Sequence, residues 1–490
     1  MALFESILTL LLLAIFLLQI SRRLGIPYPT MLAAAGLCVA ALPWAPEIAL
    51  DPHLVLVLFI APAIVDAAYD FPVRAMRQFW MPLLALAVFA VVVTAAAVAW
   101  VGVALAGLPV AAAFALGAIV SPPDAAAAVA MLNRPSVPRK TATVLKGESL
   151  LNDATALMIF ALSVRLSHAG ATMGSVLPQL ALAVPGGILF GILMGRVGGF
   201  LVTFLAGTLG SILFQFAMTF TVWLIADRLG LSAILAAVAT AMTAAHYTGS
   251  QSARDRLHMN SIWSMAVFML NVLAFLFVGL QARAIVRVLD PMELRRALAF
   301  SLVVLVVVIG VRIVLVMTYN RAIQPVYRRL GYGPGPTIKQ GILASWCGMR
   351  GMVTLAAALA LPEDFPQRGL IVLASLTVVL GTLVIQGLTL EPLVRLLRFP
   401  EDTSQREELA LVRATLAEIA ARAHAESADG VDVHHDSALR LAMVQRQRDA
   451  LRDLYRENRI EEDVFRAVEQ ELDLEEVAAT RDRPFNLVDA

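Results

Sequence analysis

Four polar side chains stand close together inside one apolar stretch of the sequence: Glu148, Ser149, Asn152 and Asp153. On a helix, Ser149 and Asp153 are four residues apart and share one face. Glu148 and Asn152 share the neighbouring stripe in the same way. Carboxylate and hydroxyl oxygens are ligands that hard cations prefer, so this pattern predicts a helix that can bind a small cation.

Ionisable residues in the middle of long apolar stretches form a short set: Asp66, Asp124, Glu148, Asp153, Arg312 and Arg350. Each is costly at membrane depth unless it has a partner or faces a water-filled cavity. A Glu148–Arg312 ion pair is the simplest arrangement. The alternative, that all six form structural ion pairs, needs equal numbers of acids and bases. Four acids against two bases leave at least one acid without a full-time partner.

A break in a membrane helix is indicated at Ser121-Pro122-Pro123-Asp124, inside the apolar stretch 109–131. Two prolines in mid-span remove two backbone donors and clash with the preceding turn. Non-helical backbone at this depth has to be shielded by protein or by a water-lined cavity. Asp124 can cap the half-helix that follows. The alternative is a purely structural proline kink with a capping aspartate.

A second break is indicated in the apolar stretch 338–360, where Gly348 and Gly351 flank Arg350. The two interrupted spans are seven apart, which suits two six-helix repeats joined by one linking span. Interrupted segments at matching positions in two halves point to the binding site of a secondary transporter. Half-helix ends that meet there offer carbonyl oxygens to a cation, and Arg350 can offset their dipoles.

The amino-acid composition indicates a membrane protein. Of 490 residues, 59% are hydrophobic and only 15% charged, against roughly 25% charged in soluble domains, which argues against a soluble enzyme. The net charge of +1 hides a division, because residues 401–490 carry 12 basic and 22 acidic side chains. The basic residues of the apolar part collect in cytoplasmic loops of membrane proteins, so they do not predict a nucleic-acid partner.

Thirteen apolar stretches are long enough to cross a bilayer at roughly 20 residues per span. We therefore predict an all-α polytopic membrane protein with about 13 transmembrane helices. The positive-inside rule places the tail, residues 396–490, in the cytoplasm. The arginines of 282–296 fall on the wrong side, so the span count is open there.

The tail is predicted to be soluble and helical, because apolar residues recur at spacings of three and four in 408–426 and 437–458. The polar linker between them contains His434 and His435. A solvated linker is the better interpretation, and a metal site or a pH sensor is the alternative. The tail could regulate, dimerise or bind a partner.

Three blocks of this sequence resemble one family: Ser121 to Asp124, Gly147 to Asp153 and Gly348 to Gly351. They are similar to motif blocks of the sodium/proton exchangers of the NhaP and eukaryotic-exchanger branch of the monovalent cation:proton antiporters. The middle block is highly specific. The resemblance covers roughly residues 1–395. It implies two inverted repeats with two broken, crossing helices, and a moving core bundle at about 79–163 and 294–394 beside a dimerisation scaffold.

The resemblance also implies roles for the polar residues. Asp153, with Asn152 beside it, would bind the cation and the proton in turn. Asp124 and Ser149 would help to ligate the transported Na⁺. Glu148 and Arg312 would form a structural ion pair. The residues that would support the broken helices are Ser121, Pro122, Gly348, Arg350 and Gly351.

The sequence departs from the family pattern at two positions. Many members have threonine-aspartate-proline at the first break, whereas here Pro123 precedes Asp124. The threonine hydroxyl is therefore missing, and the Pro123 carbonyl stands available as a ligand. Asp66 lies where the family usually has a glutamate that lines the ion path, and the shorter side chain reduces the reach.

Taken together, the resemblance implies an antiporter that exchanges Na⁺, or Li⁺, for H⁺ by alternating access, with one cation per proton. It implies a homodimer in a bacterial inner membrane, contact with membrane lipid, and no cofactor beyond the transported ions. The tail lies outside the resemblance and could make a regulatory contact with a partner or with the protein itself. A potassium/proton antiporter would share every motif, and a cation channel is a weaker alternative. An intramembrane aspartyl protease typically has a Gly-x-Gly-Asp block, which is absent here.

Overall fold

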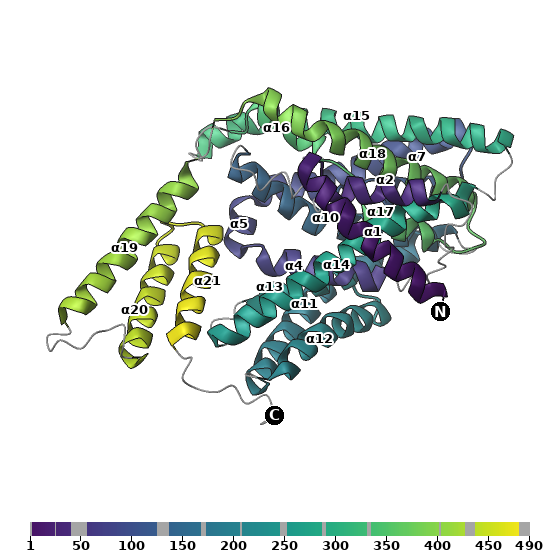
Figure 1. Ribbon diagram of the computed structural model, residues 1–490. Coiled ribbons are helices and arrows are strands. Elements are labelled where there is room, and N and C mark those ends of the chain that lie inside the picture. The colour runs from purple at the N-terminus through teal and green to yellow at the C-terminus, as the bar shows by residue number, and fades with distance from the viewer. Residues whose placement is uncertain are drawn as a thin grey trace. The chain divides into compact units, whose positions relative to one another are not determined.

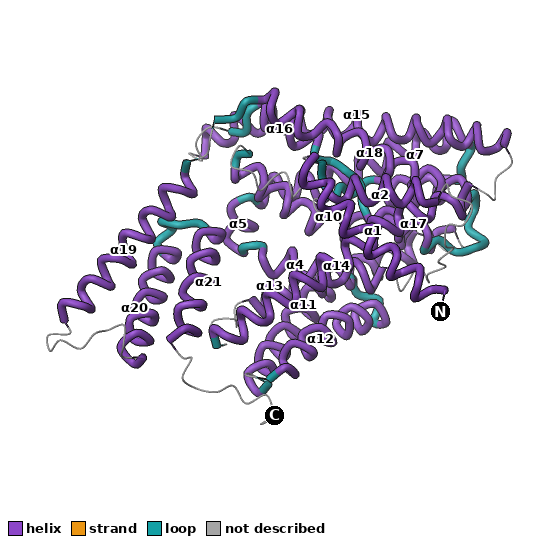
Figure 2. Tube along the Cα trace, viewed as in Figure 1, coloured by secondary structure: helices purple, strands orange, loops and turns teal. Residues whose placement is uncertain are grey.

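The structure, a computed structural model, describes residues 2–24, 26–40, 56–124, 137–167, 173–205, 208–245, 252–286, 291–330, 335–400, 403–426 and 437–479. Within these ranges every regular element is a helix and there are no strands (Figure 2). The predicted all-α fold is therefore confirmed. The linker that contains His434 and His435 lies outside the described residues, as does the continuation of the first broken span after Asp124.

The described helices are arranged along the chain as Figure 1 labels them. In order they are α1 (Ala2–Leu24), α2 (Tyr28–Ala40), η1 (Leu56–Ile60), α4 (Ala61–Asp70), α5 (Val73–Gln78), α6 (Trp80–Leu84), η2 (Ala85–Phe89), α7 (Ala90–Ala106), α8 (Val110–Val120), α10 (Arg139–Ser167), α11 (Met173–Phe204), α12 (Leu209–Arg228), α13 (Ala233–Ala245), α14 (Ala253–Val286), α15 (Pro291–Leu330), α16 (Ile338–Trp346), α17 (Met352–Leu359), α18 (Arg368–Leu397), α19 (Ser404–Glu426), α20 (Ser437–Arg456) and α21 (Glu462–Ala479). In the described part of the chain, seven helical spans are long and apolar enough to cross a membrane, and three shorter apolar helices accompany them. The count of thirteen spans stays a prediction.

The chain divides into two compact units. The first comprises residues 1–196, 218–243 and 266–401, and the second comprises 197–217, 244–265 and 402–490. In the first unit α7, α8, α10, α15, α17 and α18 pack around a core of small and branched apolar side chains. A Cβ atom on Gly117 would collide with the backbone of Ala95, so glycine at this position lets α7 and α8 approach closely.

Both predicted helix breaks are present. Helix α8 ends at Val120, and the residues from Ser121 to Asp124 are not helical. The second interruption separates α16 from α17 at residues 347–351. The two breaks meet, because the Asp124 amide donates a hydrogen bond of 2.7 Å to the Met349 carbonyl.

The arginines that contradicted the topology lie at the ends of two long helices. Helix α14 has 34 residues and α15 has 40. At 1.5 Å per residue they are about 50 and 60 Å long, well beyond the roughly 30 Å of a bilayer's hydrocarbon core. Arg283 belongs to the last turn of α14, and Arg295 and Arg296 belong to the first turns of α15. Helices that extend beyond the hydrocarbon core can therefore carry Arg295 and Arg296 without a change in span number, and Arg287 lies outside the described residues.

The tail helices of the second unit pack side by side (Figure 1). The two predicted amphipathic helices are α19 and α20, and α21 is a third that the sequence analysis did not separate. Their shared core contains Val412, Val444, Leu451, Val464 and Leu472. The assignment of residues 1–395 to a transport domain and of 396–490 to a cytoplasmic tail stays a prediction.

A cluster of buried charges joins α21 to the start of α14 within the second unit. Arg256 on α14 and Arg448 on α20 both bind the carboxylate of Asp473, which is 4% exposed. Arg448 also pairs with Glu476 at 2.6 Å. Burial raises the pKa of the nearby Glu469 carboxyl, and Arg256 opposes that rise. The shared carboxylate thus holds α20 and α21 to α14, a helix long and apolar enough to cross a membrane, and the composition of residues 401–490 did not reveal this contact.

Candidate functional site

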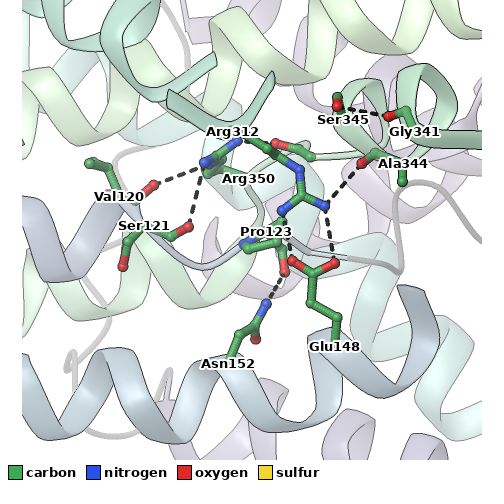
Figure 3. Close-up of polar contacts among 11 residues, drawn as sticks. Val120, Ser121, Pro123, Glu148, Asn152, Arg312, Gly341, Ala344, Ser345 and Arg350 are labelled. Atoms are coloured by element: carbon green, nitrogen blue, oxygen red, sulfur yellow. Dashed lines mark hydrogen bonds and ion pairs between the residues drawn. The ribbon is translucent and has the colours of Figure 1, made fainter. Parts of the chain in front are cut away.

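The site is built on α10, where one helical face turns toward the first break. Figure 3 shows Glu148 and Asn152 projecting from this helix toward Pro123. Glu148 is 1% exposed, and its two carboxylate oxygens accept hydrogen bonds of 2.7 and 3.1 Å from the two terminal nitrogens of Arg312. The second of these nitrogens also donates to the Ala344 carbonyl at 3.1 Å. The structure therefore brings Glu148 and Arg312 together in the bidentate geometry that charged pairs favour.

Gly348 makes room for this ion pair, and Gly147 lets α10 pack closely against neighbouring apolar side chains. A Cβ atom on Gly348 would collide with the side chain of Arg312, so the second break provides the space that the guanidinium occupies. A Cβ atom on Gly147 would meet the ring of Phe71 and a methyl group of Leu83. The remaining cavity beside the pair has a volume of only about 10 Å³. That is room for about one water molecule, so the pair is nearly dry.

Arg350 stabilises the end of the first half-helix. Its guanidinium is 1% exposed and donates to the carbonyls of Val120 at 3.1 Å and Ser121 at 3.4 Å (Figure 3). It also donates to the Gly348 carbonyl. The Val120 and Ser121 carbonyls lie at the C-terminal end of α8, where the helix dipole is negative and backbone acceptors lack helical partners. A cation from the second break thus neutralises the helix end at the first break.

Asp124 takes the reciprocal position. A Cβ atom on Gly351 would collide with the Asp124 carboxylate, so this carboxylate lies directly against the residue that precedes α17. The N-terminal end of a helix carries a positive dipole that favours an anion. The sequence analysis expected Asp124 to cap the half-helix that follows it in the chain, which lies outside the described residues. The structure places it at the start of α17.

Asn152 connects α10 to the first break and leaves one acceptor unused. Its amide nitrogen donates to the Pro123 carbonyl at 2.8 Å. Because a carbonyl only accepts, the amide oxygen must point away from Pro123. That oxygen is buried and has no hydrogen-bond partner in the described part of the chain. Burying an acceptor without a hydrogen-bond partner costs free energy, and a cation bound beside it would offset that cost.

Asp153 is a buried acid without a hydrogen-bond or ion-pair partner among the described residues. It is 8% exposed, and among the described residues no hydrogen bond or ion pair reaches its carboxylate. It lies within electrostatic reach of Asp124, so two carboxylates face the same region. The described residues contain no group of three His, Cys, Asp or Glu side chains that could hold a metal ion. The arrangement is therefore two carboxylates within electrostatic reach of each other, with the unused Asn152 oxygen on the same helix as Asp153.

The other predicted residues lie on α10, on α4 and at the first break. Ser149 is half-buried on α10, and Asp66 is half-buried on α4. Ser121 is buried and its hydroxyl donates to the Ala118 carbonyl at 3.1 Å. Pro122 is buried within the break, directly after Ser121. Sequence reasoning missed Tyr28, which begins α2 and lies within electrostatic reach of Asp124. The signal for it was weak, because a tyrosine at a predicted span end is common.

Replacing Gly351 by alanine tests the contact with Asp124. The added methyl group collides with the carboxylate, so Gly351→Ala should move Asp124 and strongly reduce cation-dependent proton flux in vesicles. Overpacking of this kind costs about 1–3 kcal/mol, so the protein should still fold. Gly310→Ala on α15 is the matched control, because nothing lies within 4 Å of its added Cβ. Wild-type flux in Gly351→Ala would show that Asp124 does not need its present position.

Two broken helices that meet beside buried carboxylates define a secondary transporter of a small cation. Comparison with known proteins gives the same result. Residues 7–396 match the family model for the transmembrane part of sodium/hydrogen exchangers. An uncharacterized Na⁺/H⁺ exchanger of Mycobacterium tuberculosis is 32% identical to this chain, over 94% of this chain and 93% of that protein. The chain belongs to the sodium/hydrogen exchanger family, so it is a multi-pass membrane protein and a cation/proton antiporter rather than an enzyme.

Other relatives are more distant. A sodium, potassium, lithium and rubidium/H⁺ antiporter of Bacillus subtilis is 29% identical, over 74% of this chain and 57% of that protein. The solved structure of the sodium proton antiporter MjNhaP1 from Methanocaldococcus jannaschii matches with a TM-score of 0.64 and 16% identity. The match covers 82% of this chain and all of that chain. At this identity the likeness shows the fold alone.

Proposed function

We propose that this protein exchanges Na⁺ for H⁺ at Asp153 by alternating access, with one cation moved per proton. The observation that carries this proposal is the Asp153 carboxylate itself, which is buried without a hydrogen-bond or ion-pair partner in the described part of the chain. The other acid of this motif on α10, Glu148, is already neutralised by its ion pair with Arg312. Asp153 is thus the carboxylate whose charge a transported ion can balance.

Competition between the two ions follows from burial. A carboxylate removed from water is unstable as a lone anion, so it needs either a proton or a cation. A bound cation displaces the proton because both use the same negative charge. The Asp153 side chain then holds one ion or the other, never both. This mutual exclusion is the chemical basis of exchange.

The proposed Na⁺ ligands are oxygens from α10 and the first break. Asp153, Asp124 and Ser149 supply carboxylate and hydroxyl oxygens, and the unused amide oxygen of Asn152 adds a neutral one. The Pro123 carbonyl already accepts a hydrogen bond from Asn152, so only its second lone pair can reach an ion. Hard oxygen ligands of this kind suit Na⁺ and Li⁺.

Obligatory coupling follows from the cost of the empty site. If the site changes sides only when it is neutral, Asp153 must carry a proton or a cation during each crossing. A charged carboxylate costs roughly 2.5–3.5 kcal/mol at the centre of a bilayer on insertion scales, which disfavours leakage by the empty form. One carboxylate that exchanges one ion for another of equal charge makes the cycle electroneutral. In this scheme the bundle of 79–163 and 294–394 moves against the rest, and Asp66 lines the path.

Potassium is the second candidate cation. The Bacillus subtilis relative is named as an antiporter of sodium, potassium, lithium and rubidium, whereas a relative in Synechocystis is named as a low-affinity Na⁺/H⁺ antiporter. The substitution of proline for a threonine before Asp124 removes a hydroxyl ligand, which loosens the selection by size.

Proton flux in vesicles tests the cation and the stoichiometry together. Purified protein in liposomes should dissipate a pH gradient on addition of Na⁺ or Li⁺, and more slowly with K⁺. An imposed membrane potential should leave the rate unchanged, because no net charge moves. A rate that follows the potential would contradict the one-to-one cycle, and equal rates with Na⁺ and K⁺ would contradict the sodium preference. Unitary currents in a planar bilayer would identify a channel instead.

The protein is proposed to lie in a bacterial inner membrane as a homodimer, with its tail in the cytoplasm. The relatives named above from Mycobacterium, Bacillus and Synechocystis are bacterial. The orientation follows from the basic loops. The contact of Arg256 with Asp473 supports a tail that acts on the protein itself.

A further inference from the structure

An apolar cavity of about 430 Å³ opens between α15, α16 and α18, which lie side by side (Figure 1). Met317, Ile342 and Leu393 each contribute to its wall, one from each helix. We call it the α16 groove. Its volume falls within the roughly 300–1,000 Å³ that is usual for small-molecule sites.

The polar groups that line the groove are already satisfied within the protein. The indole nitrogen of Trp346 donates to the Thr389 hydroxyl at 2.9 Å. The Thr389 hydroxyl donates to the Ile385 carbonyl at 2.6 Å, and the Ser345 hydroxyl donates to the Gly341 carbonyl at 2.8 Å. No donor from these three side chains is left over for a polar ligand. The groove therefore fits a hydrocarbon chain.

The surroundings of the groove are lipid-facing. Helices α15 and α18 are among the spans long and apolar enough to cross a membrane. Ile338 at the start of α16 is 66% exposed, and Leu396 near the end of α18 is 76% exposed. In a membrane protein such side chains contact lipid chains, so the bilayer itself supplies the hydrocarbon that can enter the groove.

One end of the groove is basic. Arg321 lies one turn beyond Met317 on α15, and Lys339 lies one turn before Ile342 on α16, and both are exposed. Ile313, deeper in the groove, and Arg321 are eight residues apart, or about 12 Å along the helix. One hydrocarbon leaflet is roughly 15 Å thick, half of the bilayer core. The spacing therefore suits a lipid whose chain lies in the groove and whose headgroup reaches the basic residues.

We infer that the α16 groove binds an anionic phospholipid of the cytoplasmic leaflet, with an acyl chain along α16 and the phosphate at Arg321 and Lys339. Basic residues at this depth attract anionic headgroups, and the positive-inside rule assigns this end to the cytoplasm. The site adjoins the exchange site without being part of it. Arg312 directly precedes Ile313, and it donates to the carbonyl of Ala344, the neighbour of Ser345. A bound lipid thus packs behind the backbone that holds the Glu148–Arg312 pair.

Quenching of Trp346 by brominated lipid tests the inference. The full chain is placed in phosphatidylcholine vesicles with a small fraction of brominated-chain lipid, either phosphatidylglycerol or phosphatidylcholine. The chain has six tryptophans, so the Trp346 signal is taken as the difference between wild type and Trp346→Phe. We expect brominated phosphatidylglycerol to quench this signal several-fold more than brominated phosphatidylcholine at equal fraction.

Charge variants identify the headgroup contact. The preference for phosphatidylglycerol should disappear in the double variant Arg321→Gln/Lys339→Gln. The preference should persist in Arg395→Gln. This control also removes one positive charge, from a residue near the C-terminal end of α18 that pairs with Glu391 and does not line the groove. Equal quenching by both lipids would overturn the inference, as would a preference that survives in the double variant or disappears in the control. Because quenching requires no transport, this result is independent of the proposed exchange.

Discussion

Asp153→Asn should abolish exchange while the protein still folds. Asparagine has nearly the shape of aspartate but carries no negative charge, so it can neither bind a proton nor balance a cation. Proteoliposomes of the variant should respond to Na⁺ no more than protein-free vesicles do. Because no hydrogen bond or ion pair holds the native carboxylate among the described residues, the change leaves no partner unpaired. Stability should therefore stay within about 1 kcal/mol of wild type or rise, since a buried charge has been removed.

The matched control is Asp227→Asn on α12, which makes the same chemical change at an exposed position. It should transport at the wild-type rate. Thermal unfolding of both variants in detergent separates loss of function from loss of fold. A pH gradient that still collapses on addition of Na⁺ in Asp153→Asn would show that another acid carries the exchange, and Asp124 would be the first to examine.

The two helix breaks show how far the sequence could predict the site. Prolines at 122 and 123, and glycines on either side of Arg350, give the local breaks because they act through backbone geometry. The partners of the charges at those breaks could not be found in this way. Arg350 from the second break stabilises the C-terminal end of α8, and Asp124 from the first break lies at the start of α17. Local sequence patterns show only which residues are close along the chain. These contacts join segments more than 200 residues apart, so local patterns could not predict them.

The same limit explains the two features that were missed, the unused acceptor of Asn152 and the position of Tyr28. The unused amide oxygen of Asn152 depends on where Pro123 lies in space, and helical spacing alone could only place Asn152 beside Asp153. Tyr28 approaches Asp124 from a helix that precedes it by nearly 100 residues. Counting charges predicted more of the site than local patterns did, because a buried charge needs an opposite charge wherever the partner lies in the chain. The excess of acids predicted an acid without a partner, and Asp153 is one among the described residues.

Glu148→Gln should destabilise the protein by about 3–5 kcal/mol, the usual cost of removing one partner from a buried ion pair. Glutamine keeps the shape of the side chain but leaves the Arg312 guanidinium charged in a site that is 5% exposed. Water cannot compensate, because the cavity beside the pair has room for about one molecule. Arg312 also has little room to move, because its guanidinium packs directly against the backbone of Gly348. Unfolding in mixed detergent micelles measures the loss, with Glu418→Gln in the exposed Glu418–Arg422 pair as the control, where about 0.5 kcal/mol is expected.

The double variant Glu148→Gln/Arg312→Gln decides whether the loss belongs to the pair. With both charges removed, no buried charge lacks a partner, so the double variant should be more stable than Glu148→Gln alone. If Glu148→Gln alone is as stable as wild type, the ion pair does not hold α10 against α15. If the double variant is less stable than either single variant, the two residues act separately. The expected order separates the two carboxylates of α10 by function: Glu148 holds the helices together because its charge is always paired, which leaves Asp153 as the one whose charge can change partners.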